Sequence, residues 1–303
     1  EEDGRVFPVS NSSQTIIDCF LEQVKEYKIE VLLNHPVQGI HYKNETWELD
    51  TIKGVFSTPK LLIATGSNPK IWKLLASLGH EVISAVPSLF TFNIKDPRLK
   101  TIPGVVARDV RVSVVDSNLE SEGPLLVTHT GLSAPSILKL SAYGALELAE
   151  KKYKFQIQVN FIKQTLLECN KQLFEVKKQS PKKTILKSAQ FNLPKRLWEQ
   201  LVMASNISDH LRWADVSKEK LHGLACELTQ AVFKVDGKST FKEEFVTAGG
   251  VELKGVNFKT FESKHYKNLF FAGEVLNIDA VTGGFNFQNA WTSAFIAAQQ
   301  LSK

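Results

Sequence analysis

Cysteine is scarce in this sequence, and its placement excludes several classes of site. The 303 residues include three cysteines, Cys19, Cys169 and Cys226, and no pair of them forms a CxxC motif. An odd number of widely separated cysteines argues against a disulfide framework, a zinc site and a redox-active dithiol. We therefore predict reduced thiols, no metal centre and a cytoplasmic location.

Long apolar runs and targeting segments are also missing. No run approaches the roughly 18 apolar residues that a membrane helix requires. The first ten residues, EEDGRVFPVS, are too acidic and polar for a signal peptide. We therefore expect no membrane partner. With 43% hydrophobic residues, the chain is globular and long enough for two domains.

The excess of positive charge is small. The net charge is +5, and much of the excess stands in a lysine-rich run from Lys171 to Lys187. Such a run is usually a solvated surface, and no aromatic residues alternate with the lysines as they do in many nucleic-acid-binding segments. The sequence therefore favours a small-molecule substrate and no nucleic-acid partner. It gives no indication of the oligomeric state.

The first and last parts of the chain share a pattern of short buried strands, turns and helices. Residues 13–28 have the apolar spacing of a helix, with Ser12 or Ser13 as its N-cap. Strands are predicted at 29–33 and 37–42, a hairpin at 46–49 with 54–57, and buried strands at 60–63, 245–248 and 269–272.

The middle of the chain reads differently. From about Pro87, segments such as 110–115 and 124–128 alternate or run apolar between turns, which indicates antiparallel strands. Helices are predicted at 161–174, 194–203 and 218–228, and a strand at 231–235. The predicted fold is α/β: one domain, split into 1–88 and 245–303, carries an inserted antiparallel β plus helical domain at 89–244.

The segment 268–298, NLFFAGEVLNIDAVTGGFNFQNAWTSAFIAA, carries the most functional information. A buried strand ends at Gly273-Glu274, and Gly283-Gly284 precedes a helix with a face of small residues, Ala290, Ser293, Ala294 and Ala297. Backbone N–H groups at such a helix start can hold a phosphate or the edge of an electron-rich ring. The alternative is a strand, turn and helix packed in an ordinary α/β core.

Three further motifs are candidates for a site. Ala64-Thr65-Gly66 ends a buried strand, and Thr247 with Gly249-Gly250 follows another; a glycine at either place lets a ligand approach the backbone. In Thr128-His129-Thr130, the histidine and hydroxyls can supply a proton. The same loop also reads as a capped turn, with Ser133 as N-cap, Pro135 at the first helical position and a helix through Leu140.

Together these segments resemble the YhiN/BaiN-like family of flavin oxidoreductases. The closing segment is similar to the family pattern AGEvLDvdGxxGGyNfqwAwssG, except that Asn277 replaces Asp and Ala294 replaces Gly. Further likenesses are ATG at 64–66, GH at 79–80, FTHxGlSGPaiL at 127–138, vTaGGVxl at 246–253, tMeSk at 260–264 and GRvFPxS at 4–10.

The resemblance implies a Rossmann-like FAD-binding domain and hydride transfer through the flavin, with NAD(P)H as donor and an activated carbon–carbon double bond as acceptor. It makes His129 the candidate catalytic residue. The implied cofactor-binding residues are Ala64, Thr65, Gly66, Thr247, Gly249, Gly250, Gly273, Glu274, Val275, Leu276, Gly283, Gly284, Phe285, Asn286 and Phe287. Arg5 is a further candidate for the cofactor, Ser10 a candidate helix cap, and Glu262 and Lys264 candidate ion-pair partners.

One expected motif does not occur in these residues. A Rossmann-type flavoprotein opens with a strand, GxGxxG, a helix and an acidic residue, whereas the only glycine before Gly39 is Gly4. We therefore expect this sequence to correspond to the C-terminal three quarters of such a protein, to leave strand edges uncovered, and to bind FAD weakly by itself. The alternative hypothesis is a non-catalytic or inactive fragment that does not hold FAD.

Overall fold

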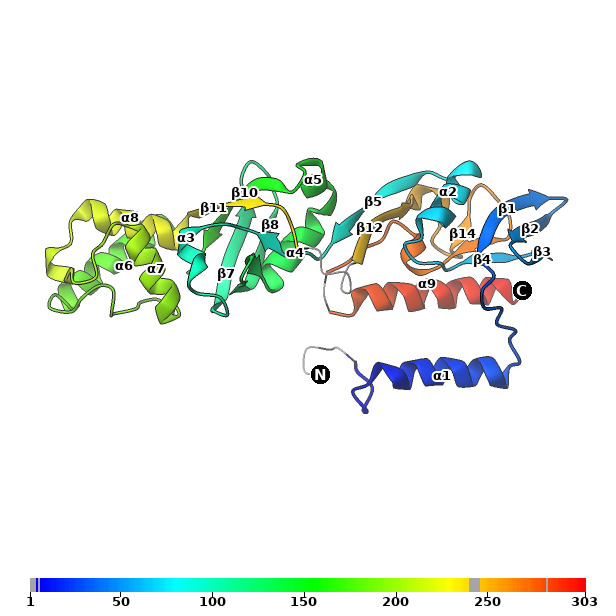
Figure 1. The fold of residues 1–303 in the computed structure, drawn as a ribbon, viewed down its shortest axis with the longest axis horizontal. Helices are drawn as coiled ribbons and strands as arrows, with labels where there is room; N and C mark the ends of the chain where they lie inside the picture. The colour runs from blue at the N-terminus through cyan, green and yellow to red at the C-terminus, as the bar shows by residue number, and fades with distance from the viewer. Residues whose placement is uncertain (1–3, 5, 240–245, 282) are drawn as a thin grey trace. The chain divides into compact units, whose positions relative to one another are not determined.

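The computed structural model describes residues 4, 6–239, 246–281 and 283–303 (Figure 1). The chain divides into two compact units. Unit 1 comprises Glu1–Ser84, Gly249–Ile278 and Gly283–Lys303, and unit 2 comprises Ala85–Ala248 and Asp279–Thr282. Strands β5 (Val82–Ser88) and β12 (Val246–Val251), which pair with each other, run across this division. The predicted domain boundary 88/89 directly follows β5, and 244/245 lies just before β12, whereas the two units divide within these strands, after Ser84 and after Ala248.

Unit 1 contains three small groups of strands and three α-helices among its described residues. Strands β1 (Val37–Lys43), β2 (Thr46–Thr51) and β3 (Gly54–Thr58) form an antiparallel sheet. A second sheet has the order β13 (Val256–Asn257), β14 (Glu262–Ser263), β15 (Leu269–Phe271), β4 (Leu61–Ile63), with β15 and β4 parallel. The helices are α1 (Ser13–Glu26), α2 (Pro69–Ser77) and α9 (Phe285–Leu301), with 3-10 turns η2 (Leu253–Gly255) and η3 (Gly273–Val275).

The core of unit 1 forms around the short parallel pair. Leu269 and Phe271 of β15 are fully buried, and Ile63 of β4 is 5% exposed. Strands buried on both faces are expected to be apolar throughout, as these two are. Helix α9 turns the small residues Ser293 and Ala297, both fully buried, toward this core. Helix α1, by contrast, has no buried residue.

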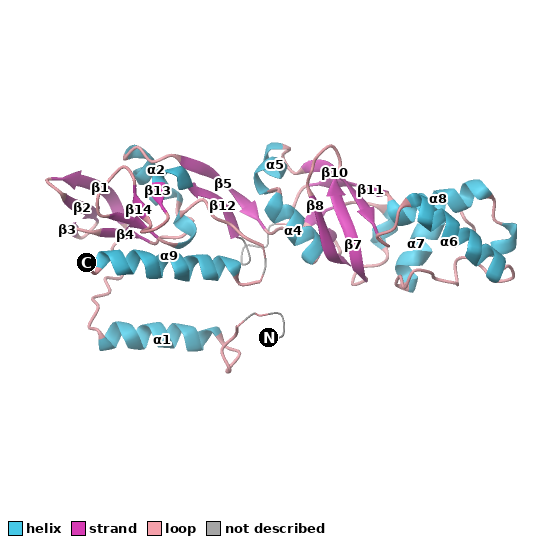
Figure 2. Ribbon diagram, turned by 180° about the vertical axis from the view of Figure 1, so that it is seen from behind, coloured by secondary structure: helices cyan, strands magenta, loops and turns pink. Residues whose placement is uncertain are grey.

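Unit 2 is an antiparallel sheet with helices attached. The sheet order is β11 (Ala231–Asp236), β10 (Lys154–Asn160), β7 (Val106–Val114), β8 (Glu120–Val127), β9 (Gly131–Ser133), β6 (Phe92–Asn93). In Figure 2 the sheet lies between α4 (Pro135–Tyr143) with α5 (Ala145–Glu150) and the helices α6 (Leu166–Gln179), α7 (Lys195–Ala204) and α8 (Lys218–Thr229). The short α3 (Pro97–Lys100) and η1 (Trp213–Asp215) complete it.

The fold class is confirmed: the chain is α/β, with a split domain around an inserted β plus helical one. Most predicted elements are confirmed within a few residues. Ser12 caps α1, accepting a hydrogen bond from the backbone N–H of Gln14, and Ser10 instead pairs with Thr15. β4 stands last in its sheet, so no described strand pairs with its outer edge.

Three element predictions are wrong. Residues 29–33 form no strand; their apolar side chains are exposed, because no neighbouring strand pairs with them. Helix α6 begins at Leu166 rather than 161, since Thr165 and Glu168 form a capping box there. Ser133 does not cap α4, because it pairs with Leu126 in the sheet and Ala134 occupies the cap position; the helix continues to Tyr143.

His80 is a buried imidazole in unit 1. It is 4% exposed, and its ring packs against those of His265, Tyr266 and Phe271 at 5.1, 6.1 and 5.3 Å between centroids. Its Nε2 lies 3.5 Å from the Ser263 hydroxyl, and its Nδ1 has no partner among the described residues. Burial, with a smaller contribution from His265, lowers the pKa of His80 from 6.5 to about 4.

This shift predicts a loss of stability in acid. Between pH 6.5 and 4 the unfolded chain binds a proton at His80 that the folded chain does not, so the free energy of unfolding falls as pH falls. In His80→Phe, the free energy of unfolding should fall by about 2–3 kcal/mol less between pH 7 and pH 4.5 than it does in the wild type. Urea titrations at the two pH values measure this difference. His41→Gln, at an exposed histidine, is the control. Equal acid sensitivity of wild type and His80→Phe would contradict the prediction.

Candidate functional site

Two loops leave the same edge of the parallel pair in unit 1. The pairing sets Leu61 opposite Leu269 and Ile63 opposite Phe271, and the Ala272 N–H donates to the Ile63 carbonyl at 3.0 Å. The carboxyl ends of β4 and β15 therefore coincide, which is where open α/β sheets bind ligands. Ala64-Thr65-Gly66 follows β4, and η3 follows β15, so the structure brings these two predicted segments together.

Helix α9 holds η3 in place. The Gly273 N–H donates to the Ser293 hydroxyl at 3.0 Å, and that hydroxyl donates to the Asn289 carbonyl at 2.6 Å. A Cβ on Gly273 would lie 3.6 Å from the Ala290 Cβ, so the backbone of η3 lies directly against the helix. The Trp72 indole N–H donates to the Val275 carbonyl at 2.9 Å. The face of small residues on α9 thus allows η3 to approach the helix closely. Ser293 and Trp72 hold the backbone of η3 by hydrogen bonds, a role that the sequence analysis did not predict.

The same contact places Gly273 near the start of α9. Gly284, in the left-handed conformation with φ of 87°, occupies the N-cap, and no described side chain caps the helix. Ala290 lies six residues farther along, a rise of about 9 Å. The predicted residues Gly273, Glu274, Gly283, Gly284, Phe285 and Asn286 therefore lie in one region of unit 1. Phe285 and Phe287 are more than half exposed there.

Glu274 is the one acidic side chain of η3. It is half-buried, and burial raises the pKa of its carboxyl above the usual range. Among the described residues it has neither a hydrogen-bond nor an ion-pair partner. A partly desolvated carboxylate without partners is costly to keep, and such groups are concentrated at binding sites. This carboxylate can accept hydrogen bonds from the hydroxyls of a polyol.

The glycines of β12 have a packing role. A Cβ on Gly250 would lie 2.7 Å from the Val275 carbonyl oxygen and 2.8 Å from the Leu276 carbonyl carbon. The Gly249 N–H donates to the Asn277 side-chain oxygen at 3.1 Å. The close contact between these two stretches of backbone is therefore enough to explain why position 250 is a glycine, and no cofactor is needed for that explanation. Asn277, which departs from the family pattern, secures this contact.

His129 lies in the turn between β8 and β9 of unit 2. The Thr128 hydroxyl accepts hydrogen bonds from the N–H groups of Thr130 and Gly131 at 3.3 and 3.1 Å, which fixes the turn. The His129 side chain is exposed, has no partner among the described residues, and lines a cavity of about 800 Å³. Thr247 also belongs to unit 2, whereas the other predicted cofactor-binding residues belong to unit 1.

The remaining sequence candidates have structural roles or lie outside the described residues. Arg5 lies outside them. Glu262 and Lys264 do not form the expected ion pair, because Glu262 accepts from the Asn268 N–H at 2.7 Å and Lys264 donates to the Lys254 carbonyl at 2.9 Å. The described part of the chain contains no group of three metal-ligating side chains, and no helix in it is long and apolar enough to cross a membrane.

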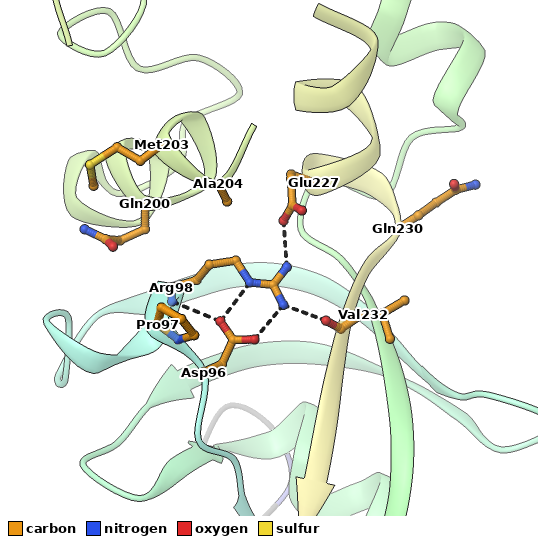
Figure 3. A pocket seen from close by; sticks show the side chains of 9 residues that line it. All are labelled: Asp96, Pro97, Arg98, Gln200, Met203, Ala204, Glu227, Gln230 and Val232. Atoms are coloured by element: carbon orange, nitrogen blue, oxygen red, sulfur yellow. Dashed lines mark hydrogen bonds and ion pairs between the residues drawn. The ribbon is translucent and has the colours of Figure 1, made fainter. Parts of the chain in front are cut away.

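A second cavity in unit 2, of about 700 Å³, surrounds Arg98 (Figure 3). The guanidinium donates to both carboxylate oxygens of Asp96 at 2.9 and 2.8 Å, to Glu227 at 2.7 Å and to the Val232 carbonyl at 2.6 Å. It also lies 4.0 Å from the centroid of the Phe233 ring. Because two carboxylates already surround this cation, it joins α3, α8 and β11 and is not available to an anion.

Comparison with known proteins gives one family. The family model described as the HI0933-like protein Rossmann domain matches residues 1–300. The ribosomal RNA dihydrouridine synthase of Escherichia coli (strain K12) is 27% identical over 98% of this chain and 74% of its own length. The enzyme of the same name from Haemophilus influenzae (strain ATCC 51907 / DSM 11121 / KW20 / Rd) is 25% identical over 100% of this chain and 76% of its own length. The 3-dehydro-bile acid delta(4,6)-reductase of Clostridium scindens (strain ATCC 35704 / DSM 5676 / VPI 13733 / 19) is 21% identical over 98% and 75%.

The contact at Gly250 predicts a large effect of one methyl group. Gly250→Ala should lower the free energy of unfolding by about 2–4 kcal/mol, because it adds overpacking and a strained φ of 124°. Gly223→Ala, in α8, has no neighbour within 4 Å of its new Cβ and should gain about 0.5–1 kcal/mol. Urea titrations of both variants test this. A Gly250→Ala protein as stable as wild type would show that β12 does not pack against η3 as described.

Proposed function

The chain belongs to the HI0933-like Rossmann-domain family of flavoprotein oxidoreductases, and we propose from this that it is an FAD-dependent reductase of carbon–carbon double bonds conjugated to a carbonyl group. The resemblance to the YhiN/BaiN-like proteins is thereby confirmed. NAD(P)H is the proposed electron donor.

The names of the relatives support this reaction class. Dihydrouridine is uridine whose ring double bond, conjugated to a carbonyl, has been reduced. A delta(4,6)-reductase acting on a 3-dehydro compound reduces double bonds conjugated to a ketone. The two substrates differ in size, charge and polymer class, but the bond that is reduced has the same electronic character. The proposal for this chain rests on that shared chemistry.

The carboxyl edge of β4 and β15 is the observation that carries the FAD proposal. Glu274 offers an unpartnered carboxylate to the hydroxyls of the cofactor, and the start of α9, which no described side chain caps, offers backbone N–H groups to its anionic or electron-rich part. The backbone of Ala64-Thr65-Gly66 borders the same edge. When bound, a flavin supplies a hydride to an electron-poor carbon.

Reduction of a conjugated double bond also requires a proton at the neighbouring carbon. We propose His129 as the donor. Its imidazole is exposed in a cavity large enough for a small substrate or one nucleotide, and histidine is the side chain best suited to proton transfer near neutral pH. The hydroxyl of Thr128 fixes the turn that presents it.

We further propose that the substrate is a uridine in RNA. Two relatives are named for ribosomal RNA, and they are more similar to this chain than the bile acid reductase is. Residues 161–230 contain twelve lysines and arginines and seven carboxylates. The difference, +5, is as large as the net charge of the whole chain. A basic surface of this kind favours binding to a phosphate backbone. This proposal replaces the expectation of no nucleic-acid partner.

The FAD proposal predicts a specific role for Glu274. With the 303-residue chain we expect weak binding of FAD, and about tenfold weaker binding for Glu274→Gln, because a charge-assisted hydrogen bond is removed. Flavin fluorescence quenching at high protein concentration measures both. Glu81→Gln, at an exposed carboxylate without a side-chain partner among the described residues, is the control. Equal binding by the two variants would reject this site, and no binding by wild type would favour the inactive-fragment hypothesis.

The reaction proposal is tested by product formation. With excess FAD and NADPH, we expect uridine in an RNA substrate to gain two hydrogens, measured by mass spectrometry of the digested nucleosides. His129→Gln should lower kcat by about a hundredfold, and His210→Gln, at another exposed histidine, should leave it unchanged. Reduction of a steroid enone in place of uridine would keep the reaction class but overturn the RNA substrate.

A further inference from the structure

We propose that the 800 Å³ cavity of unit 2 is a phosphate-binding site in which Lys95 and Lys100 are the cationic ligands. The cavity lies between the segment 93–100 and the turn 128–131. This inference deepens the proposed function and rests on it in one respect, because RNA is the expected source of the phosphate. Affinity for phosphate itself comes from the side chains on the cavity wall.

The two lysines provide charge that nothing in the described cavity wall neutralises. Lys95 follows β6, and Lys100 ends α3; both are exposed, and neither has a hydrogen-bond or ion-pair partner among the described residues. The two carboxylates on the cavity wall are already engaged. Asp96 is held by Arg98 at 2.8 Å, and Asp236 lies 3.2 Å from Lys154. Lys95 and Lys100 are therefore the two cations of the wall that no described carboxylate pairs with.

Neutral donors lie beside these lysines. The Asn93 side-chain oxygen accepts a hydrogen bond from the Ser239 hydroxyl at 2.9 Å, which orients the amide so that its NH₂ remains available to a ligand. The Thr130 hydroxyl makes only long contacts, of 3.4 Å with Thr128 and 3.5 Å with Ser239, and the His129 ring has no partner among the described residues. Lysine ammonium groups with amide, hydroxyl and imidazole donors form a common set for a phosphate oxyanion.

A comparison within unit 2 shows why this cavity differs from its neighbour. Arg98 also lines a cavity, but Asp96, Glu227 and the Val232 carbonyl use its donors (Figure 3). The lysine run at 171–187 lines neither of these two cavities. Of the two, the cavity of His129 is the one whose wall carries unpaired cations. A phosphate there would hold its nucleotide next to the proposed proton donor.

Two sources can supply the phosphate: the backbone of an RNA substrate and the 2′-phosphate of NADPH. The test uses Lys95→Gln/Lys100→Gln and, as a control with the same change of charge, Lys28→Gln/Lys53→Gln, at two exposed lysines of unit 1 that line neither cavity. A fluorescein-labelled uridine-containing RNA oligonucleotide is titrated by anisotropy at several salt concentrations. NADPH and NADH are titrated in parallel, and thermal melting shows that each variant is folded.

We expect the cavity variant to bind one of the two phosphate sources about tenfold more weakly, and the control variant less than twofold more weakly. If RNA is the source, the slope of log affinity against log salt should also fall by about 0.7, because the two lysines together neutralise one phosphate and each neutralised phosphate of a single strand adds about 0.7 to the slope. If NADPH is the source, its affinity should fall to that of NADH in the cavity variant alone.

Equal weakening by the two double variants would overturn the proposal, since it would show a diffuse effect of net charge. Unchanged affinity of the cavity variant for both RNA and NADPH would overturn it as well. The outcome does not depend on catalysis, because binding is measured without turnover. Failure of the proposed function appears separately, as absence of reduction by wild type on both RNA and an uncharged enone.

Discussion

The parallel pairing of β4 with β15 is the contact on which unit 1 depends. It joins two strands of three residues each, one before and one after the inserted unit in the sequence. Their buried apolar side chains form the centre of the core of unit 1. The parallel direction of the two strands matters for function. Both strands end at the same edge, so the pairing itself brings the loop after β4 and the turn η3 together.

Close approach of backbones is the second constraint on this region. Gly273 lies against α9 through Ser293 and Ala290, and Gly250 lies against Val275 and Leu276. Glycines that resemble cofactor contacts in the sequence are therefore required in part by packing. Glu274 is different, because nothing in the described fold accounts for a half-buried carboxylate without a partner. It is consequently the most informative side chain at this edge.

Electrostatics distinguishes the two cavities of unit 2. Around Arg98, two carboxylates and a backbone carbonyl satisfy the single cation, and the group acts as a link between α3, α8 and β11. Around His129, the carboxylates are paired elsewhere and the lysines are left unpaired among the described residues. Asp96 takes part in both arrangements. By binding Arg98, it leaves Lys95 and Lys100 without a counter-charge.

The sequence by itself determined the α/β class, the insertion of a β plus helical region, and the segments that reach the carboxyl edge. These follow from local patterns: apolar runs that end in glycine at 63–66 and 271–273, alternation in β7, and small residues spaced along α9. It misplaced Ser133 as a cap and predicted a strand at 29–33. Whether a hydroxyl caps a helix or a segment extends a sheet depends on neighbours that lie far away in the chain.

Only the tertiary structure decided which residues act together. The link from Trp72 to Val275, that from Asn277 to Gly249, and the pairing of Asp96 with Arg98 all depend on directions of side chains in space. A lysine run is visible in the sequence, but two isolated lysines beside a cavity are not. They are left unpaired because, in the folded chain, the carboxylates near them pair with Arg98 and Lys154. The local sequence does not reveal these pairings.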